Sequence, residues 1–184
     1  MKRLLLLALV FVAGCGYNQI QTLDERINAS ESQIKVQLQR RADLVPNLVE
    51  TVKAYAKQEQ TIFTAVAEAR AKLAGAVQGG NLQEMAQANG ELTAGLGRLL
   101  AIVENYPQLK SNENFRALQD QLEGTENRIS TARQDYNETV NTYNAYIRRF
   151  PQVLTAKVLG KKPRAYFELQ TPGAAEAPKV DFSR

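Results

Sequence analysis

The chain has 184 residues, with 23 lysines and arginines, 19 aspartates and glutamates, and no histidine. The missing histidine excludes His-ligated zinc and haem, the Glu-x-x-His ligand pairs of di-iron bundles, and any Ser–His or Cys–His catalytic couple within this chain. The Gly79-Gly80 pair lacks the Gly-Lys-Ser/Thr run of a phosphate-binding loop. We therefore predict no enzymatic activity, metal or cofactor. The small net charge of +4 gives no reason to expect a nucleic-acid partner.

The first residues have the pattern of a bacterial lipoprotein signal. Two basic residues precede an apolar run over 4–14, and small residues come directly before Cys15, the only cysteine. The run has about 11 residues, too few for the roughly 20 of a spanning helix. We predict a signal peptide over 1–14 and lipid modification of Cys15, which consumes the thiol. The alternatives are an uncleaved anchor and a soluble secreted chain with a stray cysteine.

The lipoprotein signal predicts a lipid-anchored, extracytoplasmic protein of the bacterial envelope. Gly16 rather than an aspartate follows Cys15. In a Gram-negative host this favours the outer membrane, with the protein facing the periplasm.

Apolar residues recur at alternating steps of three and four, the spacing of packed helices. The stripes run over 20–38, 45–73, 82–106 and 115–150, and no stretch alternates long enough for a strand. The pattern predicts an all-α protein. Polar residues interrupt the stripes at Ser30, Glu59, Asn89 and Thr125. We expect them to fix helix register or to lie at the bundle edge, with a polar pocket as the alternative.

The breaks between stripes predict four helices, at about 17–41, 46–76, 81–106 and 112–149. Gly79-Gly80-Asn81 separates two of them, and prolines end the last two. A turn at 42–45 would place Pro46 in a first helical turn, where its missing N–H costs nothing. We predict an antiparallel up-and-down four-helix bundle with long helices and a short C-terminal arm. A long helix kinked at Pro46 that packs in a dimer is the alternative.

The chain after 150 is predicted to be an arm and a tail. Residues 151–169 form a short helix or an irregular arm, with Tyr166 and Phe167 packed back onto the bundle. The tail at 170–184 has the composition of a disordered segment. Gly124, in the middle of the last long helix, is expected to allow a close helix approach, with a bend as the alternative.

Several strings spread over 17–169 resemble the LemA family. They are 36–53, 104–110, 123–129, Tyr17-Asn18, Glu68-Ala69-Arg70, Leu118-Gln119, Ala132-Arg133, Tyr136-Asn137, Tyr143-Asn144, Phe150-Pro151 and Tyr166-Phe167-Glu168. The resemblance implies a helical bundle over 15–169 with an N-terminal membrane anchor, and it supplies no biochemical activity. Family members often carry a spanning helix, whereas this chain has a lipoprotein signal.

Two charged clusters are candidate sites. The first unites the predicted first and third turns at one end of the bundle, where Arg40 or Arg41 would face Glu104; its members are Arg40, Arg41, Asp43, Glu104, Asn105 and Tyr106. It either pins helix ends or forms a recognition surface that points away from the membrane. The second is a basic arm, Lys157, Lys161, Lys162 and Arg164, which either contacts anionic lipid headgroups or is a solvated loop.

The combined pattern predicts an envelope scaffold or adaptor. Its partners would be the membrane, through lipidated Cys15, and either an unknown envelope protein or a second copy of the chain. A module that binds a lipid or a small hydrophobic ligand between its helices is the second hypothesis. An enzyme that works through carboxylates alone is the third.

Overall fold

The computed structural model describes residues 16–168, which are mostly helical and contain no strand. The helices are α2 (Tyr17–Lys53), α3 (Gln60–Gly79), α4 (Leu82–Val103), α5 (Pro107–Lys110), α6 (Glu113–Tyr146) and α7 (Gln152–Val158). The prediction of an all-α chain is therefore confirmed for the described part. The predicted signal peptide, Cys15 and the predicted tail at 170–184 lie outside the described residues.

The described residues divide into two compact units. Unit 1 contains the residues up to Gln37 together with Glu126–Phe167, and unit 2 contains Leu38–Thr125. Both α2 and α6 contribute residues to each unit. The helical content is confirmed for the described residues, but the four-helix bundle stays a prediction.

The predicted first turn at 42–45 is wrong. Helix α2 continues through these residues and includes Pro46, and the chain turns at 54–59 instead. Proline inside a helix removes a backbone hydrogen bond to the carbonyl four residues earlier, here that of Ala42. The side chain of Arg70 on α3 donates from Nε to this carbonyl oxygen at 3.2 Å. The group that proline leaves unpaired thus has a donor from a neighbouring helix.

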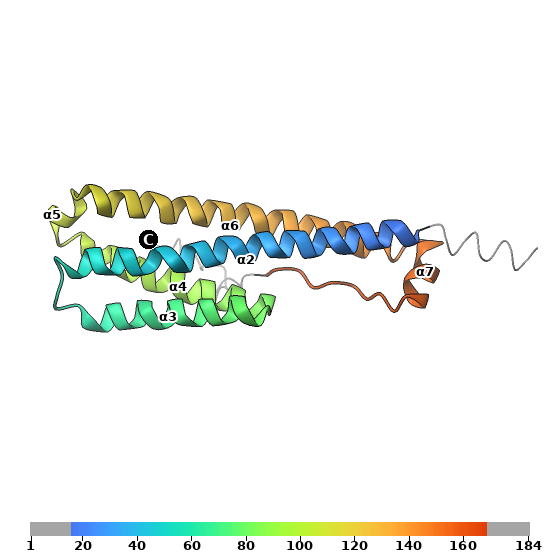
Figure 1. Cartoon of the computed structure of the whole chain (residues 1–184), viewed down its shortest axis with the longest axis horizontal. Helices are drawn as coiled ribbons and strands as arrows, with labels where there is room; N and C mark the ends of the chain where they lie inside the picture. Colours follow the sequence, from blue (N-terminus) through green and yellow to red (C-terminus); the bar gives the residue numbers. More distant parts are fainter. Residues whose placement is uncertain (1–15, 169–184) are drawn as a thin grey trace, which may run out of the picture. The chain divides into compact units, whose positions relative to one another are not determined.

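The predicted turn between α3 and α4 is confirmed. Gly80 adopts a left-handed conformation with φ of 73°, and its N–H donates to the carbonyl of Ala76. Asn81 begins α4, because its side chain accepts hydrogen bonds from the backbone N–H groups of Gln83 and Glu84. The two helices lie side by side in unit 2 (Figure 1).

Glycine allows a close helix approach at Gly95 rather than at Gly124. A Cβ at Gly95 would lie 3.4 Å from Cγ2 of Val66 on α3, whereas a Cβ at Gly124 would meet open space. The expectation for Gly124 is therefore wrong.

The predicted stripes supply the core of both units. In unit 1 the buried apolar residues include Ile20, Leu23, Ile27, Ile34, Ile129, Tyr136, Val140 and Tyr143; in unit 2 they include Leu38, Leu48, Phe63, Val66, Met85, Leu92, Leu99 and Phe115. Two stripe residues depart from this pattern, because Phe150 is 80% exposed and Tyr55 is 40% exposed. Among the helices of the described residues, none combines the length and the apolar character needed to cross a bilayer.

Candidate functional site

The two turns at one end of unit 2 lie against each other. The amide of Asn112, which precedes α6, donates to the hydroxyl of Tyr55 at 3.2 Å. Tyr55 lies in the 54–59 turn and remains 40% exposed. Asn112 also accepts a hydrogen bond from the N–H of Phe115, so it caps α6. We call the exposed residues of 54–59 and 104–112 the turn surface.

The predicted cluster does not form as such, because several of its members contact other residues instead. Arg41 is buried within α2, and its Nη1 donates to Oδ1 of Asn89 on α4 at 2.7 Å. Glu104 forms an ion pair of 2.6 Å with Lys110. Because α2 does not turn at 42–45, the reason for placing Arg40 or Arg41 opposite Glu104 no longer holds.

The remaining members of this cluster are exposed or half-buried on α2 and next to α5. Arg40 and Asp43 are exposed on α2, and Asp43 accepts a hydrogen bond from Gln39 at 2.8 Å. Asn105 is exposed, and Tyr106 is half-buried at the start of α5. The structure therefore brings Asn105 to the turn surface, with Tyr106 half-buried next to it, and it places Tyr55 there in place of the predicted arginines.

Asn89 and Thr125 are buried as the stripes predict, and both have hydrogen-bond partners. Asn89 holds Arg41, and Thr125 donates to the carbonyl of Leu122 on its own helix at 2.7 Å. Ser30 likewise donates to a backbone carbonyl, that of Ile27. Glu59 lies in the turn before α3 rather than on a helical stripe.

In unit 1, a turn at Leu159 and Gly160 ends α7, and an extended arm at 161–167 then runs back along α6. The side chain of Asn144 donates to the carbonyl of Arg164 at 2.9 Å and accepts from its N–H at 2.8 Å. Asn137 makes the same pair of bonds with Phe167, at 3.1 and 2.8 Å. Each asparagine thus satisfies both backbone groups of one arm residue, as a neighbouring strand would.

Tyrosine side chains complete the contact between α6 and the arm. The hydroxyl of Tyr136 donates to the carbonyl of Ala165 at 3.0 Å. Burial raises the pKa of Tyr136 above its ordinary value, with a further contribution from the charge of Glu31. The phenol therefore keeps the proton that it donates. Phe167 is buried, as predicted, and its ring lies 5.2 Å from the guanidinium of Arg133, but Tyr166, predicted to pack beside it, is 41% exposed.

Asp24 on α2 binds two of the four basic residues that were predicted to contact lipid headgroups. Its carboxylate forms ion pairs with Lys161 at 2.6 Å and with Arg164 at 2.8 Å. Burial raises the pKa of Asp24, but the hydrogen bonds and charges of Lys161 and Arg164 outweigh it, so the pKa lies below the ordinary value of 3.8. Lys157 and Lys162 are exposed. The basic arm therefore has a structural half and an accessible half.

A surface pocket of about 480 Å³ lies between α2 and α6 in unit 1. Seven of its eight lining residues have polar or charged side chains, with Ala132 as the exception: Ser30, Gln33, Gln37, Asn127, Arg128, Thr131, Ala132 and Asp135. A site for a lipid or hydrophobic ligand would instead be lined mainly by apolar side chains. This pocket does not favour the ligand-binding hypothesis.

Sequence reasoning missed several of these residues. The asparagines that hold the arm had a signal, since the Tyr-Asn pair at 136–137 recurs seven residues later at 143–144. Tyr55 lies in a turn that has neither glycine nor proline, so no local signal marked it. The sequence pattern places Phe150 in a stripe and puts Leu154 and Val158 in the predicted arm at 151–169, whereas all three are exposed.

Comparisons with known proteins identify the family of this chain. The model of the LemA family matches residues 30–182. Magnetosome protein MamQ 1 and MamQ 2 of Paramagnetospirillum magneticum are each 32% identical to the chain over 180 residues, and MamQ of Magnetospirillum gryphiswaldense is 31% identical. The alignments cover 85% of this chain and 66% of each relative, so the chain spans slightly less than two thirds of their length. The chain belongs to the LemA family.

Proposed function

We propose that this chain is a membrane-anchored envelope lipoprotein that acts as a non-catalytic scaffold or adaptor. The turn surface of unit 2 carries the proposal, because it gathers exposed polar and aromatic side chains from two separate turns. The charged residues that could have supplied chemistry are instead engaged in structural pairs: Arg41 with Asn89, Glu104 with Lys110, and Asp24 with the arm. The names of the relatives refer to a cellular structure and not to a reaction.

The membrane attachment is proposed from the N-terminal sequence. A charged start, an apolar run and small residues before Cys15 support export and lipid modification. In a Gram-negative host, Gly16 favours the outer membrane with the protein facing the periplasm. Metabolic labelling with palmitate tests this: we expect label in the wild-type chain and none in a Cys15→Ser variant, which should leave the membrane fraction. An unchanged membrane fraction for the variant would contradict the lipid anchor.

Photocrosslinking in cells tests the scaffold function. Gln58 and Asn105, the positions for the photoreactive residue, lie on the turn surface. The matched control is Gln78, an exposed glutamine in the last turn of α3, at the opposite end of that helix from the 54–59 turn. We expect one recurrent protein neighbour from Gln58 and Asn105 but not from Gln78. Crosslinks to a second copy alone would make the protein a homo-oligomeric scaffold. No crosslink from either position would contradict partner binding by this surface.

A further inference from the structure

Three large apolar side chains in α7 or just before it are exposed in unit 1. Phe150 immediately precedes the turn into α7 and is 80% exposed, while Leu154 and Val158 are 49% and 87% exposed. Leu154 and Val158 are four residues apart on α7 and therefore share a face of this helix. Grouped exposed apolar residues of this size indicate an interaction surface. We call Phe150, Leu154 and Val158 the apolar triad.

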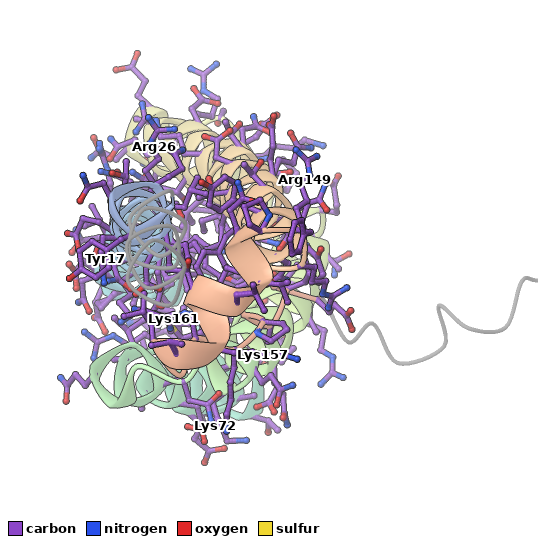
Figure 2. All side chains as sticks on the ribbon, turned by 90° about the vertical axis from the view of Figure 1, so that its right-hand side faces the viewer. Tyr17, Arg26, Lys72, Arg149, Lys157 and Lys161 are labelled. Atoms are coloured by element: carbon purple, nitrogen blue, oxygen red, sulfur yellow. The ribbon has the colours of Figure 1, made fainter. Side chains whose placement is uncertain are left out.

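Positive charge predominates around the apolar triad, because the Asp24 carboxylate that reaches this end of unit 1 is already paired with Lys161 and Arg164. The segments 16–23 and 139–167, which build this end of unit 1, contain no aspartate or glutamate. Four cationic side chains here are exposed and have no carboxylate partner among the described residues: Arg148, Arg149, Lys157 and Lys162. Figure 2 looks onto α7, with Arg149, Lys157 and Lys161 labelled around it. Lys161 is excluded from the set because Asp24 binds it.

The N-terminal end of the described chain lies directly on α7. A Cβ at Gly16 would come within 3.1 Å of Cγ of Gln152, the first residue of α7, and 3.4 Å of the hydroxyl of Tyr146. Gly16 is covalently joined to Cys15, the residue whose thiol is proposed to carry the lipid. A membrane anchor at Cys15 would therefore hold the apolar triad at the bilayer surface.

We propose that α7 and the apolar triad form an interfacial contact with an anionic lipid bilayer. In this contact Phe150, Leu154 and Val158 enter the boundary between headgroups and acyl chains, and the four unpaired cations lie at the level of the phosphates. A bilayer fits this surface better than a protein groove does, because long basic side chains around an apolar helix face suit anionic headgroups above acyl chains. The inference rests on the membrane location in the proposed function, but not on a protein partner.

Tryptophan fluorescence in vesicles tests the contact. The chain contains no tryptophan, so Val158→Trp creates a unique reporter, and Val36→Trp is the matched control at another exposed valine of unit 1. The full protein is reconstituted into phosphatidylcholine vesicles with or without phosphatidylglycerol, using acyl chains that carry bromine as quencher. Because an interfacial helix is immersed by about 5–10 Å, we expect quenching of Val158→Trp about twofold stronger than of Val36→Trp in anionic vesicles.

The charge requirement has its own variant. In the Val158→Trp protein, Lys157→Gln and Lys162→Gln should weaken the contact about fivefold for each cation removed, and the quenching should fall accordingly. Equal quenching in neutral and anionic vesicles would overturn the role of the cations. If Val158→Trp is quenched no more than Val36→Trp while the protein still floats with the vesicles, the interfacial contact is overturned and the anchor stands. Protein that does not float with the vesicles would overturn the membrane location itself.

Discussion

Arg70 donates a hydrogen bond from Nε to the carbonyl oxygen of Ala42, at 3.2 Å and between two different helices. This carbonyl would normally bind the N–H of residue 46, but residue 46 is proline and has none. Ala42 is fully buried, so without Arg70 its oxygen would lack a partner in an apolar environment. A long-range side-chain contact thus permits proline inside a continuous helix.

Replacing Arg70 with methionine should reduce the free energy of unfolding by about 1–3 kcal/mol, because a buried carbonyl loses its donor. In a Pro46→Ala background the loss should be smaller, since the new N–H of residue 46 can bind Ala42. Urea unfolding of the two single variants and the double variant measures this coupling. Arg98→Met, at an exposed arginine of α4, is the control and should change little. Equal losses in both backgrounds would contradict the link between Arg70 and Pro46.

Replacing Asn89 with alanine should destabilise unit 2 by about 1.5–3 kcal/mol, because the buried guanidinium of Arg41 loses an acceptor. Asn89→Asp keeps an oxygen at the same position and should retain more stability than the alanine variant. Urea unfolding followed by circular dichroism provides the measurement. If alanine and aspartate variants are equally destabilised, the hydrogen bond does not account for the effect.

Replacing Asn144 with alanine should release the arm near Arg164 without unfolding the helices. Two hydrogen bonds to the backbone of Arg164 are lost, at about 1 kcal/mol each, which corresponds to roughly thirtyfold faster amide exchange. Hydrogen-exchange mass spectrometry of the peptide covering 160–168 measures it. Asn141→Ala is the control, since Asn141 accepts only a long bond of 3.4 Å from the exposed Tyr166. Unchanged protection in Asn144→Ala would show that the arm is held by other contacts.

Acid should loosen the contact between α2 and the arm. The pKa of Asp24 in the folded protein lies below its ordinary value of 3.8. Its contribution to stability is therefore fully present above about pH 4 and is lost as the pH falls through the folded pKa. Asp24→Asn should remove this part of the pH dependence, measured as unfolding free energy between pH 7 and strong acid. Asp135→Asn, at an exposed carboxylate of α6, should leave the acid profile in place.

The helical stripes were predictable because burial repeats with the period of the helix, and residues such as Ile27, Leu92 and Val140 are buried as the spacing requires. The position of the first turn was not. Pro46 is a strong local signal for a break. The helix continues because Arg70 donates to the carbonyl of Ala42, and this contact between residues 28 apart depends on tertiary structure. Conversely, the true turn at 54–59 carries no glycine or proline.

The candidate site was predictable only in part. The predicted return of Tyr166 and Phe167 onto the helices is confirmed for Phe167, which is buried, whereas Tyr166 remains 41% exposed. Which cations remain accessible could not be foreseen, because Asp24 lies 137 residues from Lys161 in sequence. Opposite charges this far apart give no pattern that a single sequence reveals.

The spacing of the two asparagines on α6 matches the spacing of the two arm residues that they bind. From Asn137 to Asn144 is seven residues of helix, a rise of about 10.5 Å. From Arg164 to Phe167 is three residues of extended chain, a span of about 10 Å. Seven residues of α6 therefore have about the same length as three residues of the arm, so both asparagines can bind arm residues at once. A residue inserted between Arg164 and Phe167 would put one of the two asparagines out of phase, whereas the loop before Lys161 carries no such constraint of phase.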